Sequence, residues 1–415
     1  AQPPAGSIRR VSALCKSAVE HAHDFILLGG ALGLFAIFAG LASARVNAPL
    51  LLVFLIIGML AGEDGPGGIV FSDFNSSYLI GSIALAAILF EGGFKTERAM
   101  LKAAFWPALA MGTVGVAATA VIVAGAGVWL FGVSWGEAMV IGAALAPTDA
   151  AAVGLLLRQA RVAIPDRLTA LLEIESGLND PMSVFLTVLF VEALVHPGAM
   201  TTGHIIGFFA LEMGGGAVFG LIGGYILLAL LRRLPAEASI FPILTFAAVL
   251  TLFGAAQSVG ASGFLAVYLM GIITGTSDYK TRARMEEFYE AFAWLAQIAL
   301  FLLLGLLVTP STLLGQAPAI AAVAVVLILV ARPVAAFACL LPFGFGMRGS
   351  SFAAWVGLRG AVPIYLTIIP VLQGMPNGER LFGIAFGTVV ASLVVQGWTI
   401  GHAAALLGYG RTNKG

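Results

Sequence analysis

Residues 175–181 read Glu-Ser-Gly-Leu-Asn-Asp-Pro and lie in the middle of a long apolar stretch. Leu171 and Leu172 precede this segment, and an apolar run at 184–191 follows it. A carboxylate at the centre of a bilayer costs about 3 kcal/mol of insertion free energy, so an acid found there points to a functional site. Glu175 and Asp180 therefore mark both a buried membrane helix and a candidate ion site.

The composition is that of a polytopic membrane protein. The chain has 415 residues, of which 60% are hydrophobic and only 10% are charged, whereas soluble proteins carry about 25% charged residues. The net charge of zero gives no indication of a nucleic-acid partner. Cys15 and Cys339 lie far apart and form neither a metal motif nor a disulfide framework. Nothing in the composition predicts an enzyme or a cofactor.

Apolar segments separated by charged or Gly/Pro-rich breaks predict an all-α protein of about thirteen transmembrane helices. Their expected ranges are 25–43, 48–61, 78–92, 103–131, 136–158, 166–194, 204–232, 238–256, 261–276, 286–308, 315–341, 350–371 and 380–408. Residues 1–24 then form an N-terminal tail, 25–408 the transmembrane domain and 409–415 a cytoplasmic stub. If the first six and last six helices are repeats, they cover 25–194 and 238–408, and the helix at 204–232 links them.

The distribution of basic residues predicts the orientation of these helices. Most of the 21 basic residues follow odd-numbered ranges, such as Arg45, Lys95, Arg98, Lys102, Arg158, Arg161, Arg167, Arg232, Arg233, Lys280, Arg282, Arg284, Arg348, Arg411 and Lys414. The opposite side receives Arg380 and the tail residues Arg9, Arg10 and Lys16. Because positive loops stay in the cytoplasm, we expect the C-terminus inside and the N-terminus outside.

Two of the predicted helices are interrupted. The fifth contains Ala146-Pro147-Thr148-Asp149, and the twelfth contains Gly357-Leu358-Arg359-Gly360 followed by Pro363. Proline removes a backbone donor and blocks a helical carbonyl, so the fifth helix should unwind there. Paired broken helices at corresponding places in two repeats indicate a transport site near the bilayer midplane. Asp149 would neutralise facing helix N-termini and Arg359 facing C-termini. The simpler interpretation is a proline kink with Asp149 as an N-cap.

The acids supply the chemistry of a monovalent cation site. At 3.6 residues per turn, Ser176 and Asp180 share one face of their helix, and Thr148 adds an oxygen from the broken one. Oxygen ligands suit hard cations, and the lack of Cys and His argues against a transition metal. In a low-dielectric site, Asp180 can hold a proton or a cation but not both, which is the basis of exchange.

Other acidic and basic residues leave alternatives open. Asp180 could instead be a permanent partner of a buried arginine, but Glu175 is available for that role. Arg332 and Arg359 both fall inside predicted helices and need partners, and the residues alone allow Glu175 to pair with either. Glu91 is either a second acid of the cavity or a solvated helix end. We expect other acids near span ends, among them Glu192 and Glu212, to reach water.

Together these motifs resemble the NhaP-type monovalent cation–proton antiporters, relatives of the animal NHE exchangers. The stretches at 173–181, 293–297, 304–308 and 331–333 are similar to the bacterial branch described as potassium/proton antiporters. The resemblance implies inverted repeats with crossed broken helices, and a core domain that moves against a dimerisation domain. It also implies a homodimer in the bacterial inner membrane that exchanges K⁺, or alternatively Na⁺, for H⁺.

The resemblance also assigns roles to residues. It implies that Asp180 binds the cation or the proton, that Asn179 holds the core helices together, and that Thr148 and Ser176 supply oxygens. It pairs Glu175 with Arg332, matches Glu91 to an acidic position, and associates Asn-Asp with electroneutral one-for-one exchange. Potassium-type relatives often continue into soluble regulatory domains, whereas this sequence ends at Gly415. We therefore expect either a protein without such a domain or a sequence from which it was removed.

Two functions of other classes use some of the same features. A cation channel would use similar oxygen ligands, but it needs a continuous pore. A non-transporting membrane sensor would explain the helices and leave the buried Asn-Asp pair without a role.

Overall fold

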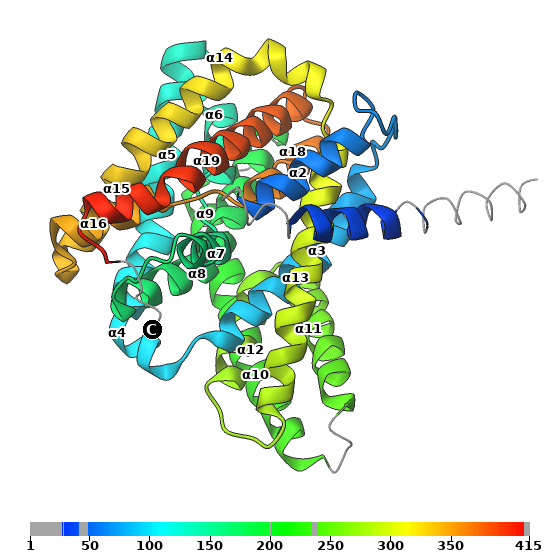
Figure 1. Ribbon diagram of the computed structural model, residues 1–415, viewed down its shortest axis with the longest axis vertical. Coiled ribbons are helices and arrows are strands. Elements are labelled where there is room, and N and C mark those ends of the chain that lie inside the picture. The colour runs from blue at the N-terminus through cyan, green and yellow to red at the C-terminus, as the bar shows by residue number, and fades with distance from the viewer. Residues whose placement is uncertain are drawn as a thin grey trace, which may run out of the picture.

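The computed structural model describes residues 27, 29–40, 49–196, 198, 201–234 and 239–410. Over these residues the chain is helical apart from connecting segments and one isolated bridge between Gly62 and Ile69. The predicted tail at 1–24, most of the predicted stub at 409–415, and the basic residues Arg45, Arg411 and Lys414 lie outside the described residues. The expected all-α class is therefore confirmed for the part of the chain that the structure describes (Figure 1).

Each of the expected ranges overlaps one or more helices. In chain order the described helices are Gly29–Gly40, α2 (Leu50–Ala61), α3 (Phe74–Lys95), α4 (Arg98–Ala110), η1 (Met111–Gly115), α5 (Val116–Phe131), α6 (Trp135–Ala144), α7 (Ala150–Gln159), α8 (Asp166–Val195), α9 (Thr202–Phe209), η2 (Ala210–Gly215), α10 (Gly216–Arg233), α11 (Ile240–Ser258), α12 (Gly263–Gly275), α13 (Arg282–Leu307), α14 (Pro310–Val326), η3 (Leu327–Ala331), α15 (Arg332–Leu340), η4 (Leu341–Phe343), α16 (Gly346–Trp355), α17 (Ala361–Leu366), α18 (Ile368–Leu372) and α19 (Gly378–Leu406).

Eight continuous helical stretches of the described chain are long and apolar enough to cross a membrane, and shorter apolar helices accompany them. The total of thirteen crossings stays a prediction. Several helices begin earlier than expected. α3 begins at Phe74 inside the stretch expected to be a loop, because Asp73 caps it by accepting a hydrogen bond of 3.0 Å from the Ser76 backbone N–H.

The expected breaks occur at the positions of proline and glycine. α6 ends at Ala144 and α7 begins at Ala150, so Pro147 lies in the unwound segment between them. α16 ends at Trp355 and α17 begins at Ala361, with Gly357 and Gly360 in between. Both breaks leave backbone groups without helical partners, and these groups are available to the site.

Three long helices contain π-helical turns. η1 interrupts the fourth expected helix and η3 the eleventh, seven helices later in the chain. η1 packs against α15 and η3 against α5, so each π-turn contacts the helix that continues from the other π-turn. The third π-turn, η2, lies in the helix between the proposed repeats.

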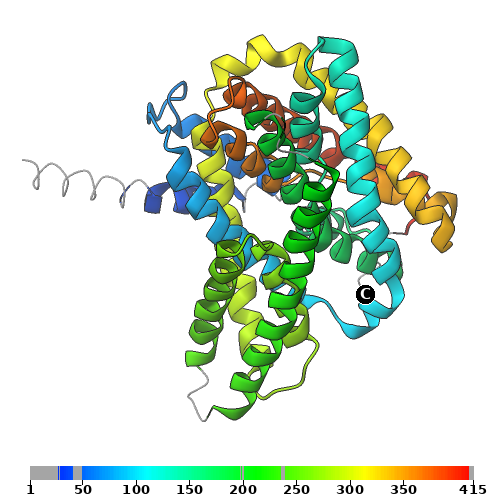
Figure 2. The same ribbon diagram turned by 180° about the vertical axis from the view of Figure 1, so that it is seen from behind.

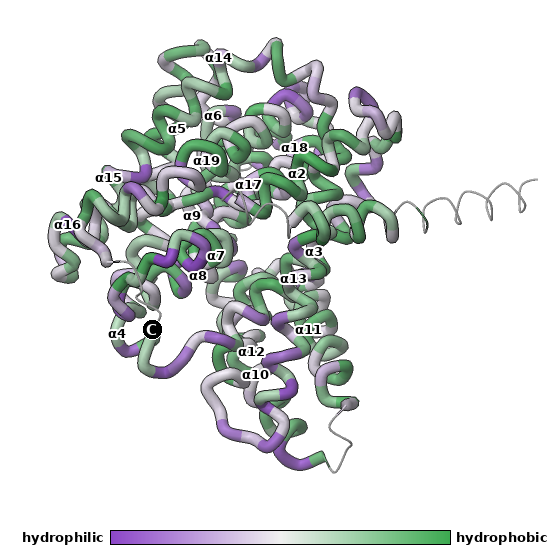
Figure 3. Tube along the Cα trace, viewed as in Figure 1, coloured by the Kyte–Doolittle hydropathy of each residue, from purple (hydrophilic) through white to green (hydrophobic). Residues whose placement is uncertain are grey.

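The helices pack in two groups. α3, α10, α11, α12 and α13 pack mainly on one another, and α4 to α8 pack on one another and on α14 to α19. In Figures 1 and 2 the first group extends to the lower end of the molecule, and α5, α6, α14 and α19 lie in the upper part. Figure 3 shows hydrophobic residues along most helices and hydrophilic ones mainly in connecting segments.

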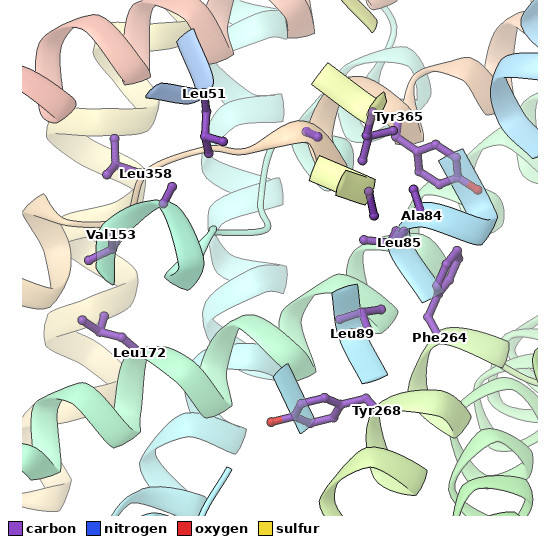
Figure 4. Close-up of a cluster of buried hydrophobic side chains, with 14 of the residues drawn as sticks. Leu51, Ala84, Leu85, Leu89, Val153, Leu172, Phe264, Tyr268, Leu358 and Tyr365 are labelled. Atoms are coloured by element: carbon purple, nitrogen blue, oxygen red, sulfur yellow. The ribbon is translucent and has the colours of Figure 1, made fainter. Parts of the chain in front are cut away.

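Buried side chains from both groups meet in one hydrophobic cluster. Figure 4 shows Leu89 of α3 and Phe264 and Tyr268 of α12 on one side, with Val153 of α7 and Leu172 of α8 on the other. The outer surface is apolar as well, as the exposure of Trp129 (84%) and Leu314 (79%) shows. An apolar surface is expected for helices that face lipid.

Candidate functional site

The unwound segments of the two broken helices are joined by hydrogen bonds. The Asp149 backbone N–H donates to the Leu358 carbonyl over 2.9 Å. Arg359 Nη1 donates to the carbonyls of Ala146 at 3.0 Å and Pro147 at 3.1 Å. These carbonyls follow the C-terminal end of α6, so the buried guanidinium lies where the helix dipole is negative. Compensation of the helix dipole by Arg359 stays a prediction.

Asp149 lies beside helix N-termini, whereas Arg359 lies beside a helix C-terminus. Its carboxylate caps α7 by accepting a 2.9 Å hydrogen bond from the Ala152 backbone N–H. The same carboxylate packs against Gly360, just before α17 begins, and a Cβ at Gly360 would collide with it. The capping interpretation of Asp149 thus holds, and the carboxylate also lies beside a second helix start. A negative charge at such ends is stabilised by the backbone N–H groups.

Asn179 and Ser176 of α8 attach this helix to the broken segment. Asn179 Nδ2 donates to the Thr148 hydroxyl over 2.8 Å. Ser176 Oγ donates to the Thr148 carbonyl over 2.9 Å and accepts from the Ala150 backbone N–H at 3.3 Å. Ser176 therefore supports the backbone beside Asp180, and its hydroxyl does not bond the Asp180 carboxylate as its position on the shared face suggested.

Asp180 is a buried carboxylate facing a cavity. Its side chain is only 5% exposed, and its Oδ1 atom has no hydrogen-bond partner among the described residues. The cavity has a volume of about 240 Å³ and is lined by Asp180, Thr148, Asp149, Ser176, Gly360 and Tyr268. No arginine or lysine forms an ion pair with Asp180 within the described part of the chain. The arrangement therefore provides an acid with free oxygen atoms in a space large enough for a small ion.

Charged side chains near the end of α3 and α7 and the beginning of α8 and α13 also line the cavity. Lys95 lies 2.6 Å from Glu91 and 3.6 Å from Glu290. Arg158 and Glu173 line the same cavity. Glu91 lines the cavity and is paired with Lys95 near the end of α3, and its role as a second acid of the site stays a prediction. Lys95 and Glu290 were not expected at the site, since neither belongs to a motif.

Glu175 and Arg332 form a buried ion pair away from the cavity lining. The guanidinium contacts both carboxylate oxygens, with 3.1 Å between Arg332 Nη2 and Glu175 Oε2. Arg332 Nη2 also donates to the Ala353 carbonyl over 3.3 Å. The glutamate is 1% exposed and the arginine 3%. Of the two arginines that the residues alone allowed, Arg332 is the one that contacts Glu175.

Tyr268 lines one wall of the cavity, although it belongs to no motif that could have indicated this. Its ring, on α12, packs directly against Gly177 of α8, where any larger residue would collide with it. The tyrosine is 1% exposed. No group of three or more metal-ligating side chains occurs in the described ranges.

The comparisons with known proteins agree with the geometry. The family described as "Sodium/hydrogen exchanger, transmembrane" matches residues 33–406. The chain is 44% identical to the K(+)/H(+) antiporter NhaP of Alkalimonas amylolytica over 92% of this chain and 66% of that protein. It is 41% identical to the K(+)/H(+) antiporter NhaP2 of Shewanella oneidensis, over 92% and 67% respectively. The chain thus spans about two thirds of the length of these curated relatives.

More distant proteins share the fold. The Na(+)/H(+) antiporter NhaG of Bacillus atrophaeus is 28% identical over 82% of this chain and 66% of that protein. The structure of the sodium proton antiporter MjNhaP1 from Methanocaldococcus jannaschii superposes with a TM-score of 0.79 at 22% identity, covering 91% of this chain and 97% of that one. This likeness shows a common arrangement of helices.

Proposed function

Because the chain belongs to the sodium/hydrogen exchanger family, we propose that it exchanges a monovalent cation for protons across the bacterial inner membrane. The observation that carries this proposal is Asp180, a buried carboxylate with an unpartnered oxygen atom that faces a cavity. Charged side chains, among them Lys95, line one end of this cavity. Thr148 and Ser176 are the neighbouring oxygen-bearing residues that would complete the cation site, and Asn179 would hold it together.

Exchange follows from competition at one carboxylate. When Asp180 is ionised, a cation neutralises it, and when it is protonated, the cation has no charge to bind. Burial penalises an ionised carboxylate that has no partner. A state in which Asp180 is both ionised and without a cation is therefore disfavoured while the site moves from one side of the membrane to the other. Asn179 adds no second negative charge, so one cation is exchanged for one proton and the cycle is electroneutral. Asp149 stays occupied by the helix ends it caps.

Alternating access would arise from movement of the two packing groups against each other. The cavity lies between α3, α12 and α13 of one group and α7 and α8 of the other. Under the orientation predicted from the basic residues, its charged end faces the cytoplasm. The matching π-turns η1 and η3 and the matching breaks after α6 and α16 support two repeats, related by the inverted topology that such transporters use. We infer an elevator movement of the core within a homodimer.

Potassium is the cation we favour. The relatives named as K(+)/H(+) antiporters are 40–44% identical to this chain, whereas the relative named as a Na(+)/H(+) antiporter is 28% identical. Both ions take the same oxygen ligands, so the choice between them depends on cavity size and ligand number. Sodium exchange by the same site is the alternative.

The test measures proton movement in proteoliposomes whose interior has been made acidic and whose internal pH is reported by a fluorescent dye. Adding K⁺, Na⁺ or Li⁺ separately at several pH values should dequench the dye, with K⁺ acting at the lowest concentration. A rate that does not change when the membrane potential is clamped at zero would support electroneutrality. A cation flux that ignores a clamped proton gradient would indicate a channel, and no cation-dependent pH change would contradict transport altogether.

A further inference from the structure

Glu212 is a buried acid outside the site described above. It lies within the continuous helix Thr202–Arg233 rather than near its end, and it is 6% exposed. Its Oε2 atom has no hydrogen-bond partner among the described residues, and no ion pair involves it there. The expectation that Glu212 reaches water by snorkelling is therefore wrong. The hydropathy of the segment could not indicate this, because burial depends on which helices cover Glu212.

The π-turn η2 places Glu212 at the start of α12. η2 spans Ala210–Gly215, and its wider winding frees backbone carbonyls from the helical ladder. The Glu212 carbonyl accepts a 2.9 Å hydrogen bond from the backbone N–H of Ser262, which caps α12. Two glycines then allow close packing, because a Cβ at Gly215 or Gly216 would press on Ala261 or Ser262. Glu212 thus belongs to a π-turn that packs on α8 and is hydrogen-bonded to the residue that caps α12.

Helix geometry gives the depth of Glu212 relative to Asp180. α8 ends at Val195 and α9 begins at Thr202, so the last residue of α8 and the first residue of α9 lie at the same end of the helix bundle. Glu212 is about ten residues, or roughly 15 Å, from that end, and Asp180 is about fifteen residues, or roughly 22 Å. Glu212 therefore lies closer to this end than Asp180, opposite to the charged end of the cavity. Under the proposed orientation this end is external.

Aromatic rings of α8 and α9 pack on one another about one helical turn before Glu212 in the chain. Phe185 of α8 packs on Phe208 at 5.5 Å and on Phe209 at 5.2 Å between ring centroids. Further toward the same end, His204 Nε2 lies 3.9 Å from Glu192 Oε1. A polar pair at the surface, an aromatic contact and then a buried acid follow one another along the junction of α8 with α9 and η2. This order is what a closed outer half of a transport route would show.

The elements packed on η2 carry few other titratable groups. These are His204 on α9, Tyr225, Arg232 and Arg233 on α10, Asp180 and Glu192 in the second half of α8, and Tyr268 on α12. No hydrogen bond or ion pair joins any of them to the Glu212 carboxylate in the described structure. An acid without a cationic partner must be neutral, or must bind a cation, whenever it is shielded from water.

We propose that Glu212 is a second carboxylate that binds the transported proton or cation, in the outer half of the route between Asp180 and the external solution. This inference rests on the proposed antiport function and extends it. When α8 moves against α12 and the Phe185–Phe208 contact opens, Glu212 exchanges a proton with the outer solution and passes it toward Asp180. A purely structural role would not need an acid, because a neutral amide of the same shape would serve equally well.

The variant that separates these roles is Glu212→Gln, which keeps the shape of the side chain and removes its titration. Exchange is measured in oriented vesicles while the outer and inner pH are varied in turn. We expect the rate at alkaline outer pH to fall by about a hundredfold, the low end of the effect of a proton-transferring side chain. The dependence on inner pH should not change. Glu379→Gln, an exposed acid in the first turn of α19, is the control and should behave as the wild type.

A second measurement does not depend on transport activity or on the folding of the variant. An apolar carbodiimide should label Glu212 in the wild-type protein, and K⁺ added from the outer side should protect it, as read by mass spectrometry. An unchanged outer-pH profile in Glu212→Gln, or an equal change on both sides, would overturn the proposal, and so would labelling that K⁺ does not reduce. A wild-type protein without cation-dependent proton exchange would instead refute the proposed function.

Discussion

Asn179 Nδ2 donates a 2.8 Å hydrogen bond to the hydroxyl of Thr148, and this contact fixes α8 to the unwound segment between α6 and α7. Asp180 is the next residue along α8, so the same contact sets where its carboxylate lies relative to that segment. Ser176 reinforces it one turn earlier through the Thr148 carbonyl. The position of the acid therefore depends on two short polar side chains rather than on an ion pair.

The first prediction concerns Asp180→Asn. The amide has nearly the same shape but cannot exchange a proton or carry the charge that attracts a cation. We expect cation-dependent proton exchange in proteoliposomes to be lost. The melting temperature should stay at or above that of the wild type, because a buried charge has been removed. Asp73→Asn is the matched control, since Asp73 is an exposed cap of α3. Retained exchange in Asp180→Asn would refute the assignment of the site.

Much of this architecture could be predicted because it depends on local chemistry. Pro147 and the glycines at 357 and 360 interrupt their helices for reasons that a sequence displays, and the charge pattern separates one apolar range from the next. The sequence led us to expect Thr148 near Asp180, but the hydrogen bond between Thr148 and Asn179 is seen only in the structure. The family resemblance then selected Arg332 rather than Arg359 as the partner of Glu175, a choice that spacing alone left open.

Other features could not be predicted from the sequence, because they depend on which helices lie side by side in the fold. Tyr268 faces the cavity only because α12 packs on α8 at Gly177. Lys95 contacts Glu290 across two helices that are far apart in the chain. Glu212 is buried where the π-turn η2 packs on neighbouring helices, and hydropathy carries no signal for that packing.

The second prediction concerns the buried pair of Glu175 and Arg332. Removing either partner leaves an uncompensated buried charge, so Glu175→Ala and Arg332→Ala should each lower the free energy of unfolding by about 3–5 kcal/mol. The double variant should lose much less than the sum, because the second change removes the charge that the first left unpaired. Thermal unfolding in detergent measures this coupling. Strictly additive losses would show that the contact contributes nothing specific.

The third prediction concerns pH and the loop after α2. Hydrogen bonds from the hydroxyl and then the backbone N–H of Ser311 lower the pKa of the exposed Asp64 below its ordinary value of 3.8. A carboxylate with a lowered pKa stabilises the fold fully above its ordinary pKa, and this contribution is lost as the pH falls through its lower, folded pKa. Asp64→Asn should therefore melt below the wild type at pH 5, and the difference should shrink below pH 3.8.

The control for this effect is Glu63→Gln, which changes the neighbouring exposed acid. The melting temperature of Glu63→Gln should change between pH 5 and lower pH by the same amount as that of the wild type. A gap between Asp64→Asn and the wild type that stays constant as the solution is acidified would mean that ionisation of Asp64 is not responsible.

The last prediction concerns the contact of Gly177 with Tyr268, where α8 meets α12. A methyl group at Gly177 would overlap the tyrosine ring, and the ring cannot retreat because the Tyr268 backbone packs closely on Gly93 of α3. Gly177→Ala should therefore destabilise the protein by about 1–3 kcal/mol through overpacking and slow exchange, since the helices must shift past this point. Tyr268→Leu in the same chain should restore part of both. Gly254→Ala, in open space on α11, is the control. If Gly177→Ala alone exchanges at the wild-type rate, α8 and α12 do not move past each other at this contact.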